Sequence, residues 1–379
     1  MRRISRLLFI LVSAFVIFSN LPVVHAKDTA GQAPETFYKA EVEAILDQGE
    51  IRAYGFVNPY QKVKVKIENG DIENKEIVIV QGQDIHIDPS QLVQAGQTIV
   101  VTKIKGPDGQ DSYQIADTYR LDKLTTIIII FFIAIIVLSG WQGLGSIFGM
   151  IVSLVVIAKF VIPQILAGHD PLFISIVGCL VIMFITIYLA HGFSKKTTIA
   201  LISTFLTLIL TGALSTLFVH MTFLSGLGSD DAYALQIGPE AKINFRGLLL
   251  GGILIGTLGV LDDVTTGLSA SVFELYKANP KISFGQLLKS GLAIGREHIS
   301  SLVNTLVLAY AGASLPIFLT LVLNPNNYPL WSILNSELIV EEIVRTLAGS
   351  IGLVAAVPLT TFLATIYITE FYSKSKKTN

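Results

Sequence analysis

The stretch LTTIIIIFFIAIIVLSGW, residues 124–141, decides the fold class of this chain. It contains no charged side chain, and a helix of about 20 apolar residues suffices to cross the hydrocarbon core of a bilayer. Six further apolar runs predict further spans, at residues 144–166, 171–190, 197–219, 246–263, 299–323 and 346–370. The sequence therefore predicts an α-helical membrane bundle of about seven transmembrane helices over residues 123–379.

The residues before this stretch have a different composition. Of the 379 residues, 52% are hydrophobic and 15% are charged, whereas a soluble domain has about 25% charged residues. Residues 27–123 hold 11 basic and 16 acidic side chains, while residues 124–379 hold 13 and 12, mostly between the apolar runs. The chain therefore consists of a polar region followed by an apolar region.

Charge balance and cysteine content exclude several kinds of site. The formal net charge is −1, and no basic stripe with interleaved aromatic residues is present, so we do not expect nucleic acid as a partner. The single cysteine, Cys179, lies inside an apolar run, which excludes intramolecular disulfides and cysteine-based metal sites. No cofactor is expected.

The first 26 residues have the pattern of a signal peptide. Arginines near the start precede an apolar run at residues 7–18, and the small residue Ala26 offers a cleavage point. The alternative is an uncleaved anchor helix. In both cases we expect the chain from Lys27 onward to lie outside the cytoplasm, beginning with a polar linker at residues 27–36.

Residues 37–122 have the pattern of a small β-domain. Charged and apolar residues alternate over 62–68, with the two-residue period of a half-buried strand, and turn residues at 106–109 connect two β-rich runs. Five or six such strands predict a small extracytoplasmic all-β domain, an OB-like barrel. We expect it to be structural or to dock a protein partner. Acidic residues flank His86 and suggest a metal site, but the solvent face of a strand explains them better.

The basic residues predict how the spans are oriented. Cytoplasmic loops of membrane proteins carry an excess of lysine and arginine. With the β-domain outside, the predicted cytoplasmic segments carry nine basic side chains and the predicted outer loops carry three. An odd number of spans then places the lysine-rich C-terminus in the cytoplasm. We therefore expect a multi-pass protein of the cell membrane.

Residues 246–323 contain the residues most suited to chemistry. Gly252, Gly256 and Gly259 lie on one helical face with Asp263, and the first two form a GxxxG motif that allows close helix approach. Because a stripe of small residues faces protein, we expect Asp263 to face the bundle interior near its cytoplasmic end, and Asp262 to point about 100° away, toward the headgroups. An intramembrane carboxylate is a functional candidate. The alternative is a hydrated helix end.

A polar ridge enters the next apolar run. Arg296, Ser300 and Asn304 recur at one-turn spacing. Arg296 is placed to neutralise an acid on the facing helix, so we expect Asp263, Glu274, Arg296 and Asn304 to converge. Transporters build their ion and substrate sites from interrupted helices of this kind. The candidate site residues are Asp263, Glu274, Arg296, Glu297, Asn304 and Thr305, and the candidate helix-packing residues are Gly252, Gly256, Gly259, Gly291 and Gly295.

Four motifs in this region carry a family resemblance. GVLDDV at 259–264, FEL at 273–275, SGLAIGRE at 290–297 and NTLVLAYAGASLP at 304–316 resemble the YibE/F family of bacterial membrane proteins. The polar region, which ends in YRL at 119–121, is similar to that family's N-terminal region, so the resemblance covers nearly the whole mature chain.

The resemblance implies a polytopic membrane protein and supplies no activity. The family pattern has a single aspartate at the position of Asp263 and an apolar residue at the position of Asp262, which favours Asp263 as the functional carboxylate. Glu297 stands where the family often has aspartate, and Asn304 and Thr305 match directly.

Two function classes follow from these patterns. The first is a secondary transporter or permease for an ion or small solute, with its polar site in residues 246–323. The second is a membrane scaffold or accessory subunit that displays the outer domain to a partner. An enzyme is not expected, because the chain has no HExxH, GxSxG or P-loop motif. The substrate, metal content and oligomeric state are left open; the expected surroundings are the lipid bilayer.

Overall fold

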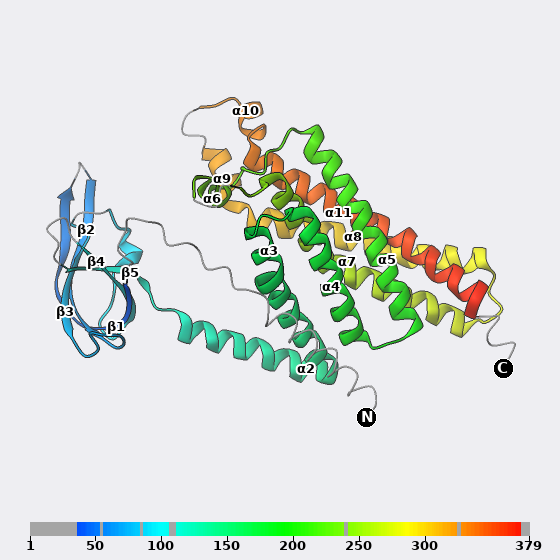
Figure 1. Ribbon diagram of the computed structural model, residues 1–379, viewed down its shortest axis with the longest axis horizontal. Coiled ribbons are helices and arrows are strands. Elements are labelled where there is room, and N and C mark those ends of the chain that lie inside the picture. The colour runs from blue at the N-terminus through cyan, green and yellow to red at the C-terminus, as the bar shows by residue number, and fades with distance from the viewer. Residues whose placement is uncertain are drawn as a thin grey trace. The chain divides into compact units, whose positions relative to one another are not determined.

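A computed structural model describes residues 36–53, 56–83, 86–105, 111–238, 242–323 and 327–372 (Figure 1). The chain forms two compact units, which divide between Val137 and Leu138. The expected signal peptide, most of the expected linker, the turn at 106–109 and the lysine-rich C-terminal tail lie outside the described residues.

The N-terminal unit contains a five-stranded antiparallel sheet. Its strands are β1 (Thr36–Ala53), β2 (Phe56–Ile67), β3 (Glu76–Gln81), β4 (Thr98–Lys105) and β5 (Asp111–Thr118), in the order β3-β2-β1-β4-β5. The alternation over 62–68 is confirmed as a strand, because Val63, Val65 and Ile67 are fully buried. A single 3₁₀ turn, η1 (Pro89–Gln91), precedes β4.

The sheet curls around an apolar core (Figure 1). The long strand β1 pairs with both β2 and β4, and its pairing with β2 shifts register between Val42 and Ala44 and between Ile45 and Asp47. Such bulges bend a strand, which lets β1 serve both partners. The edge strands β3 and β5 come within 8 Å between Cα atoms, but the hydrogen-bonded order of the described residues ends at them. The sheet is therefore open, and the expected closure into a barrel is not formed.

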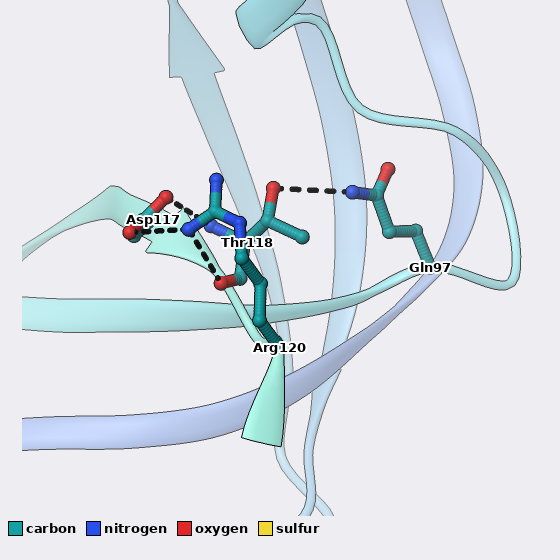
Figure 2. A network of polar contacts seen from close by, with 4 residues as sticks. All are labelled: Gln97, Asp117, Thr118 and Arg120. Atoms are coloured by element: carbon teal, nitrogen blue, oxygen red, sulfur yellow. Dashed lines mark hydrogen bonds and ion pairs between the residues drawn. The ribbon is translucent and has the colours of Figure 1, made fainter. Parts of the chain in front are cut away.

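A network of hydrogen bonds and one ion pair lies at the end of β5, directly before the first helix (Figure 2). The Arg120 Nη1 lies 2.7 Å from Asp117 Oδ2 and 3.3 Å from the Thr118 carbonyl, and Gln97 donates to the Thr118 hydroxyl at 3.2 Å. The hydrogen bond from Arg120 is the main reason that the pKa of Asp117 lies below its ordinary value. These contacts fix the strand end directly before the helix that starts at Leu121.

Helices make up the rest of the described chain. They are α2 (Leu121–Val156), η2 (Ile157–Val161), α3 (Ile162–Leu166), α4 (Pro171–His191), α5 (Lys195–Met221), α6 (Asp230–Ile237), α7 (Phe245–Ala278), α8 (Phe284–Ala313), α9 (Leu315–Leu323), α10 (Leu330–Leu334), α11 (Glu337–Ile366) and η3 (Tyr367–Tyr372). Within the described residues, six helices are long and apolar enough to cross a membrane, or seven if α8 and α9, which bend by 68°, form one span. These six or seven candidate spans agree with the expected number of about seven only if α8 and α9 form one span.

Local sequence sets where these helices begin and break. Asp170, Ser194, Asn244 and Ser283 each cap a helix, since each side chain accepts a hydrogen bond from the backbone N–H three residues later. Gly140 has φ 55° and ψ −136°, a conformation that favours glycine. It interrupts α2 at the end of the first expected span, so that Leu121–Gly140 and Gly143–Leu166 are separate candidate spans.

The interior of the bundle is rich in hydroxyl groups. Helices α5, α7 and α11 pack on one another, and their inner faces bury Ser203, Thr204, Thr207, Thr211, Ser215, Thr257, Thr265, Ser269, Thr360, Thr361 and Thr365. Small and hydroxyl residues allow helices in membranes to approach closely. A methyl group at Gly352 of α11 would collide with Thr211 of α5, which shows how close the backbones lie.

Candidate functional site

A cavity of about 700 Å³ lies between the second half of α2, the end of α4 and the middle of α7. Its walls combine apolar residues with seven polar side chains, which are Ser139, Ser146, Ser153, Thr186, His191, Asp262 and Asp263. Ile157, in the π-helical segment η2, also lines it. Insertions of this kind into α-helices occur often at functional sites.

Helix α7 places two carboxylates at this cavity, near the middle of its 34 residues. Asp262 is half-buried, and its Oδ1 atom is buried without a hydrogen-bond partner among the described residues. Thr186 of α4 lies beside it. A buried carboxylate oxygen without a partner is costly, so Oδ1 is suited to hold a proton or a cation.

Asp263 lies at the more open part of the same cavity. Its side chain is exposed, and His191 at the end of α4 lies within electrostatic range of it. Ser146 and Ser153 of α2 are seven residues apart and therefore share a helical face, while Ser139 lies just before the break at Gly140. That spacing is the sequence signal that could have identified the α2 wall; His191, at the end of an apolar run, gave no signal.

The expected orientation of the two acids is wrong. Asp262, which was expected to point toward the headgroups, is the more buried one, and Asp263 is exposed. The reason is that Asp262 lies against Thr186 of α4, whereas Asp263 lies on the part of α7 that no neighbouring helix covers within the described residues. Both acids nevertheless line the same cavity.

The glycine stripe makes only part of the expected contacts. Gly252, Gly256 and Gly259 are exposed. A Cβ atom added at Gly256 would lie 3.1 Å from the Tyr310 hydroxyl of α8, whereas one at Gly259 would meet nothing within 4 Å. The close helix contact of α7 is instead made by Gly247 and Gly251, which lie against Pro171 and Ser175 of α4. Helix α7 therefore carries two glycine ridges, and its own sequence does not distinguish the one that meets a helix.

The glycines of α8 do make the expected contacts. A Cβ atom at Gly291 would collide with Thr361 of α11 and one at Gly295 with Val357 of the same helix. Both glycines are buried. The structure thus places both glycines at a close contact between α8 and α11.

The remaining candidate residues do not converge on the cavity. Glu274 is exposed and forms an ion pair with Lys277 at 2.6 Å. It follows Asp263 by eleven residues, which is about 16 Å along a helix. On α8, Arg296, Glu297, Asn304 and Thr305 are all exposed. Within the described residues no ion pair joins Arg296 to Asp263 or Glu274, so the expected cluster is corrected.

Two other acids have a structural role. Glu337 of α11 accepts hydrogen bonds from the backbone N–H groups of Ser225 and Gly226 at 2.6 and 2.9 Å, and Glu341 accepts one from Gly228 at 3.0 Å. Gly226 has a φ of 87°. These carboxylates tie the loop after α5 to the first turns of α11.

Comparison with known proteins gives one match. A family model described as YibE/F-like protein matches residues 127–370, which is more than half of the chain. Neither the curated proteins nor the solved structures contain a significant match. The matched residues include the cavity and both of its acids but not the sheet, so the expected similarity of the polar region to that family stays a prediction.

Proposed function

The chain belongs to the YibE/F-like protein family, and from this premise we propose that it is a secondary transporter or permease that moves a cation or small cationic solute through the α2–α4–α7 cavity. The observation that carries the proposal is the pair Asp262 and Asp263 on the wall of a polar cavity, halfway along an apolar helix. The description of the family names no activity, so the proposal rests on the geometry of the cavity.

The chemistry of the wall supports a cation. Two adjacent carboxylates provide negative charge, and serine, threonine and histidine side chains provide further oxygen and nitrogen ligands. Charged residues within membrane spans mark ion and proton pathways. The break at Gly140 and the π-helical segment η2 interrupt the wall of the cavity, as broken helices do at transporter sites.

We propose the following arrangement in the cell membrane. The sheet lies outside the cytoplasm and the C-terminus inside, which the distribution of basic residues supports. A cleaved signal peptide at residues 1–26 would deliver the sheet there.

Flux measurements on the full chain in liposomes test the transport proposal. The probes are a pH-sensitive dye and indicators for Na⁺, K⁺, Mg²⁺ and Mn²⁺. We expect flux of at least one ion, its loss in Asp262→Asn, and its retention in the matched control Glu274→Gln, whose carboxylate lies outside the cavity. Equal flux in wild-type and empty liposomes for every probe would exclude cation transport.

A scaffold function is the second candidate, and one observation favours it. Strand β3 lies at the edge of the sheet, and its outward-facing Val78 and Val80 are 48% and 40% exposed. Exposed edge strands with apolar side chains are suited to pairing with another chain. Capture of one specific protein by the outer unit, lost in Val78→Lys, would support this function. We expect no enzymatic activity in either case.

A further inference from the structure

Helix α8 has two faces of opposite character. Gly291, Gly295 and Leu306 are buried, and the two glycines pack against α7 and α11. The other face exposes Arg296, Glu297, Ser300, Ser301, Asn304 and Thr305. The last four of these lie in an apolar run of spanning length, where an uncovered polar side chain faces hydrocarbon. This face, the α8 polar face, takes no part in the cavity.

We propose that a second copy of this chain covers the α8 polar face, and that the two α8 helices pack side by side around a two-fold axis along the membrane normal. The proposal requires that α8 and α9 together form the seventh span, and it is independent of transport. In such a dimer each residue meets partner residues of similar depth, because the symmetry is isologous.

The face is complementary to itself under that symmetry. Arg296 and Glu297 are adjacent and opposite in charge, so each can pair with the other residue in the second copy. Within the part of the chain that the structure describes, neither belongs to an ion pair. Asn304 both donates and accepts hydrogen bonds, so it can pair with the same residue of the second copy.

The size of the side chains suits close approach. Ala293, Ser300 and Ser301 are small, and small residues with hydroxyl or amide groups hold helices together in membranes. The apolar residues 124–138 of the same chain offer no charged or amide group, so they cannot satisfy Arg296, Glu297 or Asn304. Charge complementarity thus favours a second copy.

Cysteine cross-linking in native membranes tests the contact. We expect Asn304→Cys to form a disulfide-linked dimer on mild oxidation. The matched control is Ile209→Cys, at an exposed apolar position of α5, which we expect to stay monomeric. The wild-type chain is the blank, since its single cysteine, Cys179, is buried. Equal cross-linking at 304 and 209, or none at 304, would overturn the proposal.

A charge reversal tests the pairing. Dimerisation is measured by energy transfer between labelled copies diluted in liposomes. We expect Arg296→Glu to weaken it about tenfold through like-charge contacts, and the double variant Arg296→Glu with Glu297→Arg to restore it. A monodisperse wild-type monomer in liposomes, or a different protein bound at this face in equal amount, would contradict the second copy as the occupant.

Discussion

Asp262 and Asp263 are neighbours in the sequence, yet their surroundings differ. Helical periodicity and the family pattern both favoured Asp263, and both acids do line one cavity. Which of them is buried depends on α2 and α4, which flank α7, and that information is absent from the sequence of α7. The candidate position on α7 was therefore predictable to within one residue, whereas the partners His191 and Thr186 were not.

The unpartnered Oδ1 atom of Asp262 leads to the first prediction. Asp262→Asn removes a charge whose Oδ1 atom is buried without a partner, so we expect it to raise the stability of the folded bundle by about 1–3 kcal/mol while abolishing flux. Thermal unfolding of the protein in detergent measures this. The control Asp263→Asn changes an exposed acid and should alter the unfolding temperature little. A lower unfolding temperature for Asp262→Asn than for the control would contradict the prediction.

At the scale of helices, the sequence predicted where the spans lie better than which face of each helix packs against its neighbours. Apolar runs and capping residues located the spans, because length and caps are local properties. The packing faces were harder, since lipid is as apolar as a buried side chain and the hydrophobic pattern does not separate them. The glycines of α8 lie at tight contacts with α11, whereas on α7 the tightest contact is made by Gly251 rather than by the expected stripe.

The two ridges of α7 give the second prediction. A Cβ atom at Gly251 would collide with the Ser175 hydroxyl, whereas one at Gly252 has its nearest neighbour, Arg345 Nη1, at 3.7 Å. We therefore expect Gly251→Ala to destabilise the bundle by about 1–3 kcal/mol, the usual effect of overpacking, and Gly252→Ala to be tolerated. The fraction that stays monodisperse after heating measures both. Equal losses in the two variants would mean that Gly252 also meets a helix.

At the scale of the molecule, composition alone separated a polar unit from an apolar one, and the structure has two compact units. The strands were predictable from alternation, but closure of the sheet was not, because it depends on distant edge strands. The convergence of Asp263, Glu274, Arg296 and Asn304 was predicted from topology alone. The prediction failed because residues on two neighbouring helices share a site only if their side chains lie on the helix faces that meet.

Sidedness is the third prediction, and it concerns the whole chain. The bias of basic residues places the sheet outside and the tail inside. We expect a membrane-impermeant maleimide added to intact cells to label Asp111→Cys, and to label Thr378→Cys only after permeabilisation. Labelling of both variants from the same side would show that the number of spans is even.

The buried hydroxyls between α5 and α7 have a mechanical consequence. Thr204 shares a hydrogen bond of 2.6 Å with Thr265, and Ser269 donates to the Lys196 carbonyl at 2.8 Å, so the two helices are joined near the start of α5. Farther along α5, the hydroxyls of Thr207, Thr211 and Ser215 donate to carbonyls of their own helix. Separating the helices at that far end breaks none of these bonds. The two ends of this helix pair are therefore held by different forces, hydrogen bonds between hydroxyl and carbonyl groups at the start of α5 and, at its other end, apolar packing of Val219 in one cluster with Leu249 and Ile253 of α7.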